Sequence, residues 1–89
     1  MLDFNHVLDV EGKGSLYLTF NCISTPLKKK FHVTVLTWNH RCYHFNMEEN
    51  YGKWKMIAAP KPPGWIEQLE PMMKEMIQKH MMPEMQSMF

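Results

Sequence analysis

Three side chains in the middle of the sequence are of the types that bind metal ions. His32, Cys42 and His44 fall on one face of a predicted sheet, and imidazole and thiolate groups are common zinc ligands. Structural zinc sites almost always have four ligands, and the sequence shows no evident fourth ligand and no CxxC or HExxH motif. We therefore predict no metal site and no cofactor, and we interpret the alternation of these residues as that of a half-exposed strand.

The C-terminal segment is rich in methionine, another metal-binding side chain. Met82, Met85 and Met88 are spaced three apart, and thioether groups can bind Cu(I), a soft cation. Methionine also packs adaptably against a sheet or a partner surface. We favour packing over copper binding, because the sequence shows no secretion signal that would direct the protein to a compartment where such copper sites operate.

The sequence contains no residue arrangement that is typical of an enzyme. Gly12 and Gly14 fit a hairpin loop and not a phosphate-binding loop. Cys42 and His44 could in principle form a nucleophile and base, but both would point outward from one short strand without an orienting group. We therefore expect a protein without catalytic activity.

Lysines near aromatic residues suggest binding of single-stranded nucleic acid as an alternative function. Such binding combines cations that contact phosphates with aromatic side chains that stack on bases. The formal net charge is only +1, and the acidic first hairpin opposes a continuous basic groove, so we rank this function below protein binding. Its residues are Lys28, Lys29, Lys30, Lys53, Lys55 and Trp38.

Length and composition predict one globular domain. The chain has 89 residues, of which 45% are hydrophobic and 21% charged, as is ordinary for a globular protein with one modest core. We expect this domain to span residues 1–82 and residues 83–89 to form a frayed tail. The sequence shows neither a long apolar segment nor a basic, apolar leader, so we expect a cytoplasmic protein that does not associate with a membrane.

A two-residue periodicity predicts a five-stranded antiparallel sheet. In residues 31–59, β-branched or aromatic residues recur at every second position, which indicates three strands joined by two short turns. Residues 2–10 and 15–24 show a similar pattern around a glycine-containing loop and predict a hairpin. Short connections favour pairing of consecutive strands, which gives a β-meander.

The apolar pattern also predicts the register, because a slip of one residue moves every side chain to the opposite face. In the first hairpin we pair Leu8 with Leu18, and in the last hairpin we pair Met47 with Trp54 across a four-residue loop. The loop around His40 must have an odd length to keep the apolar residues on one face.

The same register places the two cysteines on opposite faces of the sheet. Cys22 lies on the apolar face and Cys42 on the mixed face. We therefore predict no disulfide between them, which fits a reducing compartment.

A helix follows the sheet in the predicted fold. The proline-rich segment 60–64 is a stiff connector, and Pro71 suits the first turn of a helix, so we expect a short turn at residues 64–70 before the main helix. The fold class is α+β, with a five-stranded antiparallel β-meander and one C-terminal amphipathic helix packed on its apolar face. The apolar residues at helical spacing are Trp65, Ile66, Leu69, Met73, Met76, Ile77 and His80.

The dimensions of these elements motivate the functional prediction. Five strands span about 24 Å, whereas one helix covers a strip of about 10 to 12 Å, so either the sheet curls or a second subunit completes the core. We expect a small non-catalytic protein-interaction module that forms a homodimer, with a small-ligand carrier that has a cavity between curled sheet and helix as an alternative. The mixed face offers a partner Tyr17, Leu36, Trp38 and Ile57.

Overall fold

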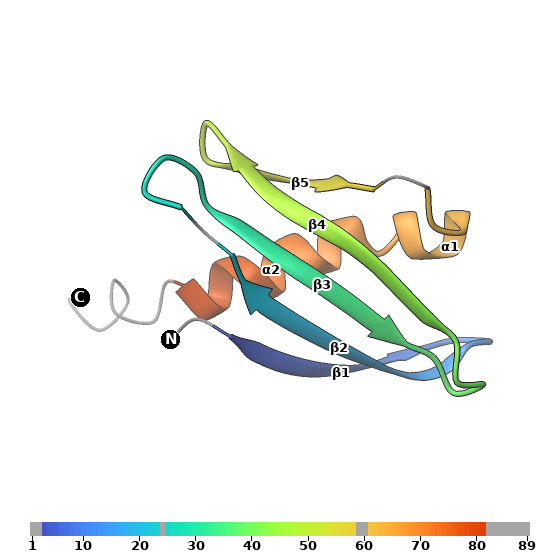
Figure 1. Cartoon of the computed structure of the whole chain (residues 1–89). Helices are drawn as coiled ribbons and strands as arrows, with labels where there is room; N and C mark the ends of the chain where they lie inside the picture. Colours follow the sequence, from blue (N-terminus) through green and yellow to red (C-terminus); the bar gives the residue numbers. More distant parts are fainter. Residues whose placement is uncertain (1–2, 24, 59–60, 82–89) are drawn as a thin grey trace.

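The computed structural model describes residues 3–23, 25–58 and 61–81, and these form a five-stranded antiparallel sheet with helices on one face (Figure 1). Strand neighbours in the sheet follow the order of the chain, so the α+β class and the β-meander are confirmed. The predicted tail at residues 83–89 lies outside the described residues. The elements are β1 (Phe4–Val10), β2 (Gly14–Cys22), β3 (Lys30–Leu36), β4 (Cys42–Asn50), β5 (Lys53–Ile57), α1 (Gly64–Glu67) and α2 (Glu70–Met81).

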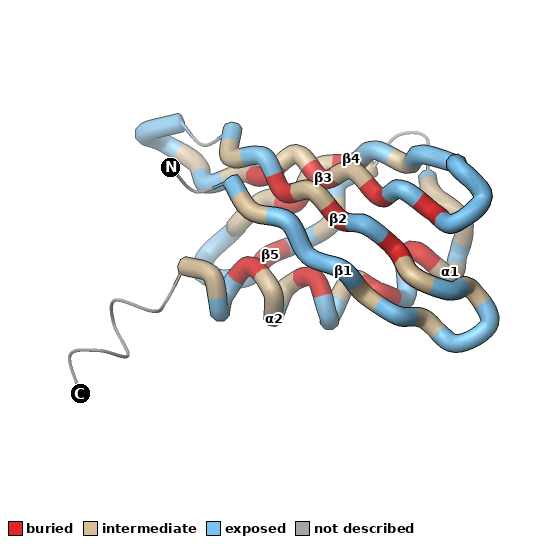
Figure 2. The backbone as a smooth tube through the Cα atoms, turned by 90° about the horizontal axis from the view of Figure 1, so that it is seen from below, coloured by how far each residue is buried: buried red, intermediate tan, exposed pale blue. Residues whose placement is uncertain are grey.

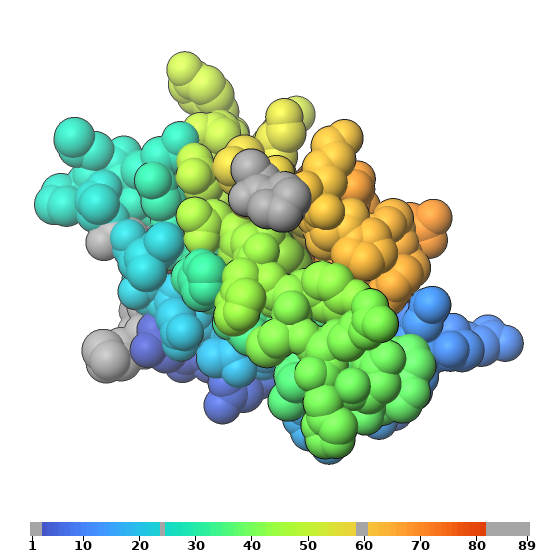
Figure 3. All heavy atoms as spheres, turned by 45° about the vertical axis from the view of Figure 1, so that its right-hand side comes forward, coloured from blue at the N-terminus to red at the C-terminus, as the bar shows by residue number. Residues whose placement is uncertain are grey.

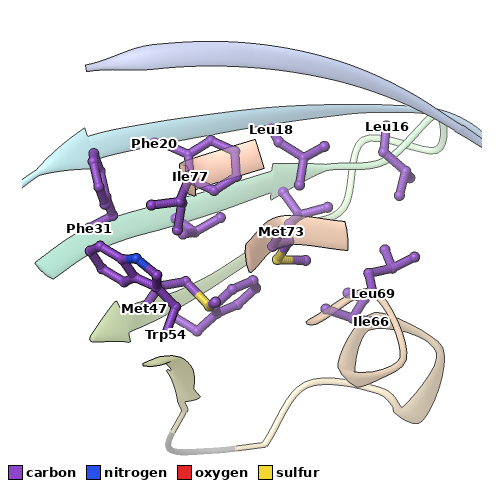
Figure 4. Close-up of a cluster of buried hydrophobic side chains, with 13 residues drawn as sticks. Leu16, Leu18, Phe20, Phe31, Met47, Trp54, Ile66, Leu69, Met73 and Ile77 are labelled. Atoms are coloured by element: carbon purple, nitrogen blue, oxygen red, sulfur yellow. The ribbon is translucent and has the colours of Figure 1, made fainter. Parts of the chain in front are cut away.

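The core is a single layer between the inner face of the sheet and the two helices (Figures 2 and 4). Alternate side chains of each strand point to the same face, and the apolar set of the central strands points to the helices. The buried sheet residues are Leu16, Leu18, Phe20, Phe31, Val33, Val35, Phe45, Met47 and Trp54, and the buried residues of the two helices and the turn between them are Ile66, Leu69, Met73 and Ile77.

The loop between β3 and β4 has five residues, so the predicted odd length is confirmed. Thr37 and Arg41 close it, because the Thr37 N–H donates to the Arg41 carbonyl at 2.8 Å and the Arg41 N–H donates to Thr37 Oγ1 at 3.1 Å. His40 has a φ of 62° in this loop. The apolar residues of β3 and β4 consequently share the inner face.

The predicted registers of the first and last hairpins are wrong by two residues. Leu8 pairs with Leu16, and Met47 pairs with Met56. A shift of two residues leaves every side chain on its face, so the apolar pattern cannot detect it. The turn decides instead, because Tyr51 and Gly52 have φ of 53° and 81° and form a two-residue connection of the kind that requires positive φ at both positions.

As predicted, a short helical segment, α1, precedes the main helix, α2. The chain leaves α1 through a tight turn in which the Leu69 N–H donates to the Ile66 carbonyl at 2.9 Å, and Pro71 lies in the first turn of α2. The Glu70 carboxylate accepts a hydrogen bond from the Met56 N–H at 2.6 Å. This bond fixes the start of α2 against the outer edge of β5.

Candidate functional site

The helices leave the first strand incompletely covered. Phe4, Leu8 and Val10 point to the inner face but are only half-buried, whereas every inner-face residue of β3 is fully buried. Figure 2 shows β1 mostly exposed at the border of the sheet. The predicted mismatch between a wide sheet and a narrow helix therefore exists, and it is concentrated at β1.

A groove of about 520 Å³ runs between β1 and α2. Phe4 and Leu8 form its apolar wall on the sheet side, and Met72 and Met76 form the wall on the helix side. At one end, the ring of Phe4 stacks on the ring of His80 with their centroids 4.0 Å apart. The remaining lining residues are polar or charged, and they are Asn5, His6, Glu75 and Lys79.

The two edges of the sheet differ in how they are protected. At β5, the Met56 N–H is occupied by Glu70, and the strand is short and carries Lys53 and Lys55. At β1, no described residue pairs with the outer edge, and the seven residues FNHVLDV contain neither lysine nor proline. Lysine, proline and short length are the usual features that prevent an edge strand from pairing with another chain. The edge of β1 is therefore the less protected one.

An apolar row crosses the open outer face of the sheet. Val7 of β1 pairs with Tyr17, Tyr17 pairs with Leu36, and Leu36 pairs with Cys42. The exposed fractions of the first three side chains are 56%, 54% and 37%. Trp38 lies in the loop beyond β3, where it lines a separate hollow with Tyr43 and Trp65, and its side chain lies 3.8 Å from the position that a Cβ atom on Gly14 would occupy.

Two of the four predicted partner-binding residues thus lie together, namely Tyr17 and Leu36, whereas the structure places Trp38 beside Tyr43 and Trp65. Ile57 does not join them, because it lies on β5 opposite Asn46, and two strands separate β5 from β2, which carries Tyr17. Val7 belongs to the row but was absent from the prediction. The incorrect register of the first hairpin placed it opposite a threonine, so its contact with Tyr17 was not visible.

The histidines of the outer face form a polar pair. The rings of His32 and His44 stack with their centroids 5.6 Å apart. Nδ1 of His32 lies 3.0 Å from Asn46 Oδ1, and Nδ1 of His44 lies 3.2 Å from Thr34 Oγ1. Cys42 is exposed, and within the described ranges no three potential ligands gather as they would around a metal ion.

The chain has no match among the protein-family models, the curated proteins or the solved structures with which it was compared. In the part of the chain that the structure describes, no helix has the length and apolar character needed to cross a bilayer. Function is therefore inferred from the surfaces of this chain alone.

The lysines of the nucleic-acid alternative gather at one end of the sheet. Lys28 Nζ lies 2.8 Å from a Glu48 carboxylate oxygen, Lys30 Nζ lies 3.8 Å from the other oxygen, and Lys55 pairs with Glu48 across the strands. The hydrogen bond from Lys28, supported by the charge of Lys30, holds the pKa of the Glu48 carboxyl below its ordinary value. Trp38 lies beyond the other end of β3, so the structure does not bring it to the lysines.

The two cysteines lie on opposite faces as predicted. Cys22 packs against the core, Cys42 is exposed on the outer face, and no disulfide joins them. The methionines considered for copper, Met82, Met85 and Met88, lie outside the described residues.

Proposed function

We propose that this protein is a non-catalytic protein-interaction module that forms a homodimer by pairing β1 with β1 of a second copy. The observation that carries the proposal is the unprotected edge of β1 beside a half-covered apolar groove. An unpaired strand edge is a template for a further strand. A second copy would add backbone hydrogen bonds and cover apolar surface at the same place.

A twofold pairing centred on Val7 uses the whole strand. In this antiparallel arrangement Phe4 faces Val10 of the second copy, and His6 faces Leu8. Inner-face residues therefore meet inner-face residues, and the two apolar faces become continuous. A closed twofold contact of this kind is the commonest symmetry of soluble oligomers.

Charge favours this centre over its neighbours. On the outer face, the pairing centred on Val7 sets Asn5 opposite Asp9 of the second copy, with no like charges opposed. Centring the pair on His6 would set Asp9 opposite Asp3, which is unfavourable. Centring it on Leu8 would leave Phe4 without an opposite strand residue.

The helix side of the groove also suits a second copy. Met72 is 46% exposed in the single chain, and Met76 is half-buried beside it. In the dimer, these two residues of both copies would border the joined strands. Methionine side chains adapt to such an interface because they are unbranched and flexible. The openness of the groove toward the free edge favours a second copy over an enclosed small ligand.

The dimer would also join the two outer apolar rows. Because Val7 faces Val7 of the second copy, the line from Leu36 through Tyr17 and Val7 continues across the twofold axis. Exposed aromatic and aliphatic residues in one contiguous strip are typical of a surface that binds a protein partner. We place the module in the cytoplasm, because cysteines that form no disulfide fit a reducing compartment.

Charge variants at Val7 test the pairing. We expect the natural chain to sediment as a dimer, and we expect Val7→Glu and Val7→Lys each to sediment as monomers, because like charges would face each other on the twofold axis. An equimolar mixture of the two variants should restore the dimer. The matched control is Ile57→Glu, an exposed apolar residue on the other edge strand, which should leave the dimer intact.

Cysteine cross-linking tests the register in a background of Cys22→Ala and Cys42→Ser. Val7→Cys should oxidise to a covalent dimer, whereas Asn5→Cys and Asp9→Cys should cross-link only when the two variants are mixed. A natural chain that remains monomeric at high concentration would refute the homodimer. A dimer that survives both Val7 variants but is lost in Tyr17→Ala would move the interface to the outer face.

A further inference from the structure

Two apolar side chains project into solvent from neighbouring loops at one end of the sheet. Leu27, between β2 and β3, is 97% exposed, and Tyr51, between β4 and β5, is 104% exposed. The loops lie side by side, because the Glu49 N–H donates to the Lys29 carbonyl at 3.0 Å. Both loops extend beyond the rest of the molecule in Figures 1 and 3, where they are teal and yellow-green.

Tyr51 has an unfavourable backbone conformation that its environment does not offset. Its φ of 53° lies in the left-handed region, where a bulky residue is rare and where turns of this type prefer asparagine, aspartate or glycine. The side chain buries nothing in the described chain. A tyrosine at this position therefore lowers stability, which points to a contact outside the chain.

Lysines surround the two apolar tips. Residues 27–30 and 48–55 contain five lysines and two glutamates, a net charge of +3, although the whole chain carries only +1. Lys29, Lys53 and Lys55 are exposed. Glu48 is the residue that reduces this charge most directly, because it forms ion pairs with Lys28 and Lys30.

We propose that this end of the protein, the lysine end, binds the surface of a bilayer that contains anionic lipids. Leu27 and Tyr51 would enter the headgroup region, where tyrosine is enriched in membrane proteins, and the lysines would contact lipid phosphates and carboxylates. A fully exposed leucine favours lipid over single-stranded nucleic acid, because leucine offers no ring on which a base can stack.

This inference goes beyond the proposed dimer and does not depend on it. It departs from the sequence-based expectation of no membrane association, which considered the total charge and spanning segments. Peripheral binding requires neither a high total charge nor a spanning helix, because it needs only a local cluster of cations with apolar side chains.

Co-sedimentation with vesicles tests the charge requirement. The natural chain should bind vesicles of phosphatidylcholine mixed with phosphatidylserine and should not bind phosphatidylcholine alone. Each lysine near an anionic surface contributes a factor of about five in affinity, so Lys53→Gln combined with Lys55→Gln should weaken binding by about 30-fold. The matched control removes two cations at the opposite end of the sheet, Lys13→Gln in the turn between β1 and β2 with Arg41→Gln in the loop between β3 and β4, and should bind like the natural chain.

Two further variants separate the components of binding. Glu48→Gln should strengthen binding by about fivefold, because it removes one negative charge from the lysine end. Leu27→Ser combined with Tyr51→Asn should remove the part of the binding that resists high salt, and circular dichroism should show an intact fold because neither side chain is buried.

Three results would overturn the proposal. The first is equal binding to both kinds of vesicle, and the second is an equal loss of binding in the control variant with Lys13 and Arg41 replaced. The third is salt-sensitive binding of a single-stranded oligonucleotide by a chain that does not bind anionic vesicles, since this would assign the lysine end to nucleic acid.

Discussion

Replacement of Ile77 by alanine gives a quantitative test of the packing of α2 on the sheet. Ile77 is fully buried in the core layer. Deleting its methylene and methyl groups loses about 0.8 kcal/mol for each and leaves a cavity, so the expected cost is about 2 to 5 kcal/mol. A domain of this length has a free energy of unfolding of roughly 4 to 13 kcal/mol. The substitution should therefore remove a large fraction of the stability.

Urea unfolding followed by circular dichroism measures this loss. The Val7→Glu background keeps the proposed dimer from contributing to the transition, and the slope with urea should not change. The control is Gln78→Ala, an exposed neighbour on the same helix, which should change the free energy of unfolding by less than about 0.5 kcal/mol. If Ile77→Ala were no more destabilising than Gln78→Ala, α2 would not lie on the sheet as described.

Three more predictions concern other parts of the fold. A chain that ends at Glu70 should aggregate or show no cooperative melting transition, because it lacks the buried face of α2, whereas a chain that ends at Met82 should melt like the full chain. Glu48→Gln should lower the urea midpoint above pH 4.5, the ordinary pKa, and this difference should disappear as the pH falls through the lowered pKa of Glu48, because only the ionised carboxylate stabilises the fold. Tyr51→Asn should raise the melting temperature by a few degrees, since asparagine tolerates positive φ, and an unchanged or lower value would contradict the strain assigned to Tyr51.

The faces of the sheet were predictable from sequence, whereas the exact pairings were not. Apolar alternation identified the buried sides of β2, β3 and β4, and the helical spacing with Pro71 identified the bend before α2. Both signals are local, because they depend on which side of an element is apolar. A register shift of two residues preserves that signal, so only the turn could have revealed it. The two-residue turn at Tyr51 and Gly52 was not predicted from the sequence, because tyrosine is not a typical residue of such a hairpin connection.

The candidate surfaces depend on how distant elements are placed. The groove exists because of where α2 crosses the inner face relative to β1, and no local pattern in Phe4 or Met72 specifies that position. The protection of β5 depends on a hydrogen bond between Met56 and Glu70, which are 14 positions apart. The lysine end could be anticipated in part, because the triplet at 28–30 was visible, but its proximity to Tyr51 required the fold.

The antiparallel order of the sheet has a consequence for valency. The first strand begins at the same end of the sheet as the two lysine-flanked loops, because Phe4 pairs with Phe20 near the point where β2 enters the first of these loops. An antiparallel pair of β1 strands would therefore turn the two lysine ends in opposite directions. Such a particle could engage one vesicle at each end and cluster vesicles, whereas the Val7→Glu monomer could bind vesicles only singly.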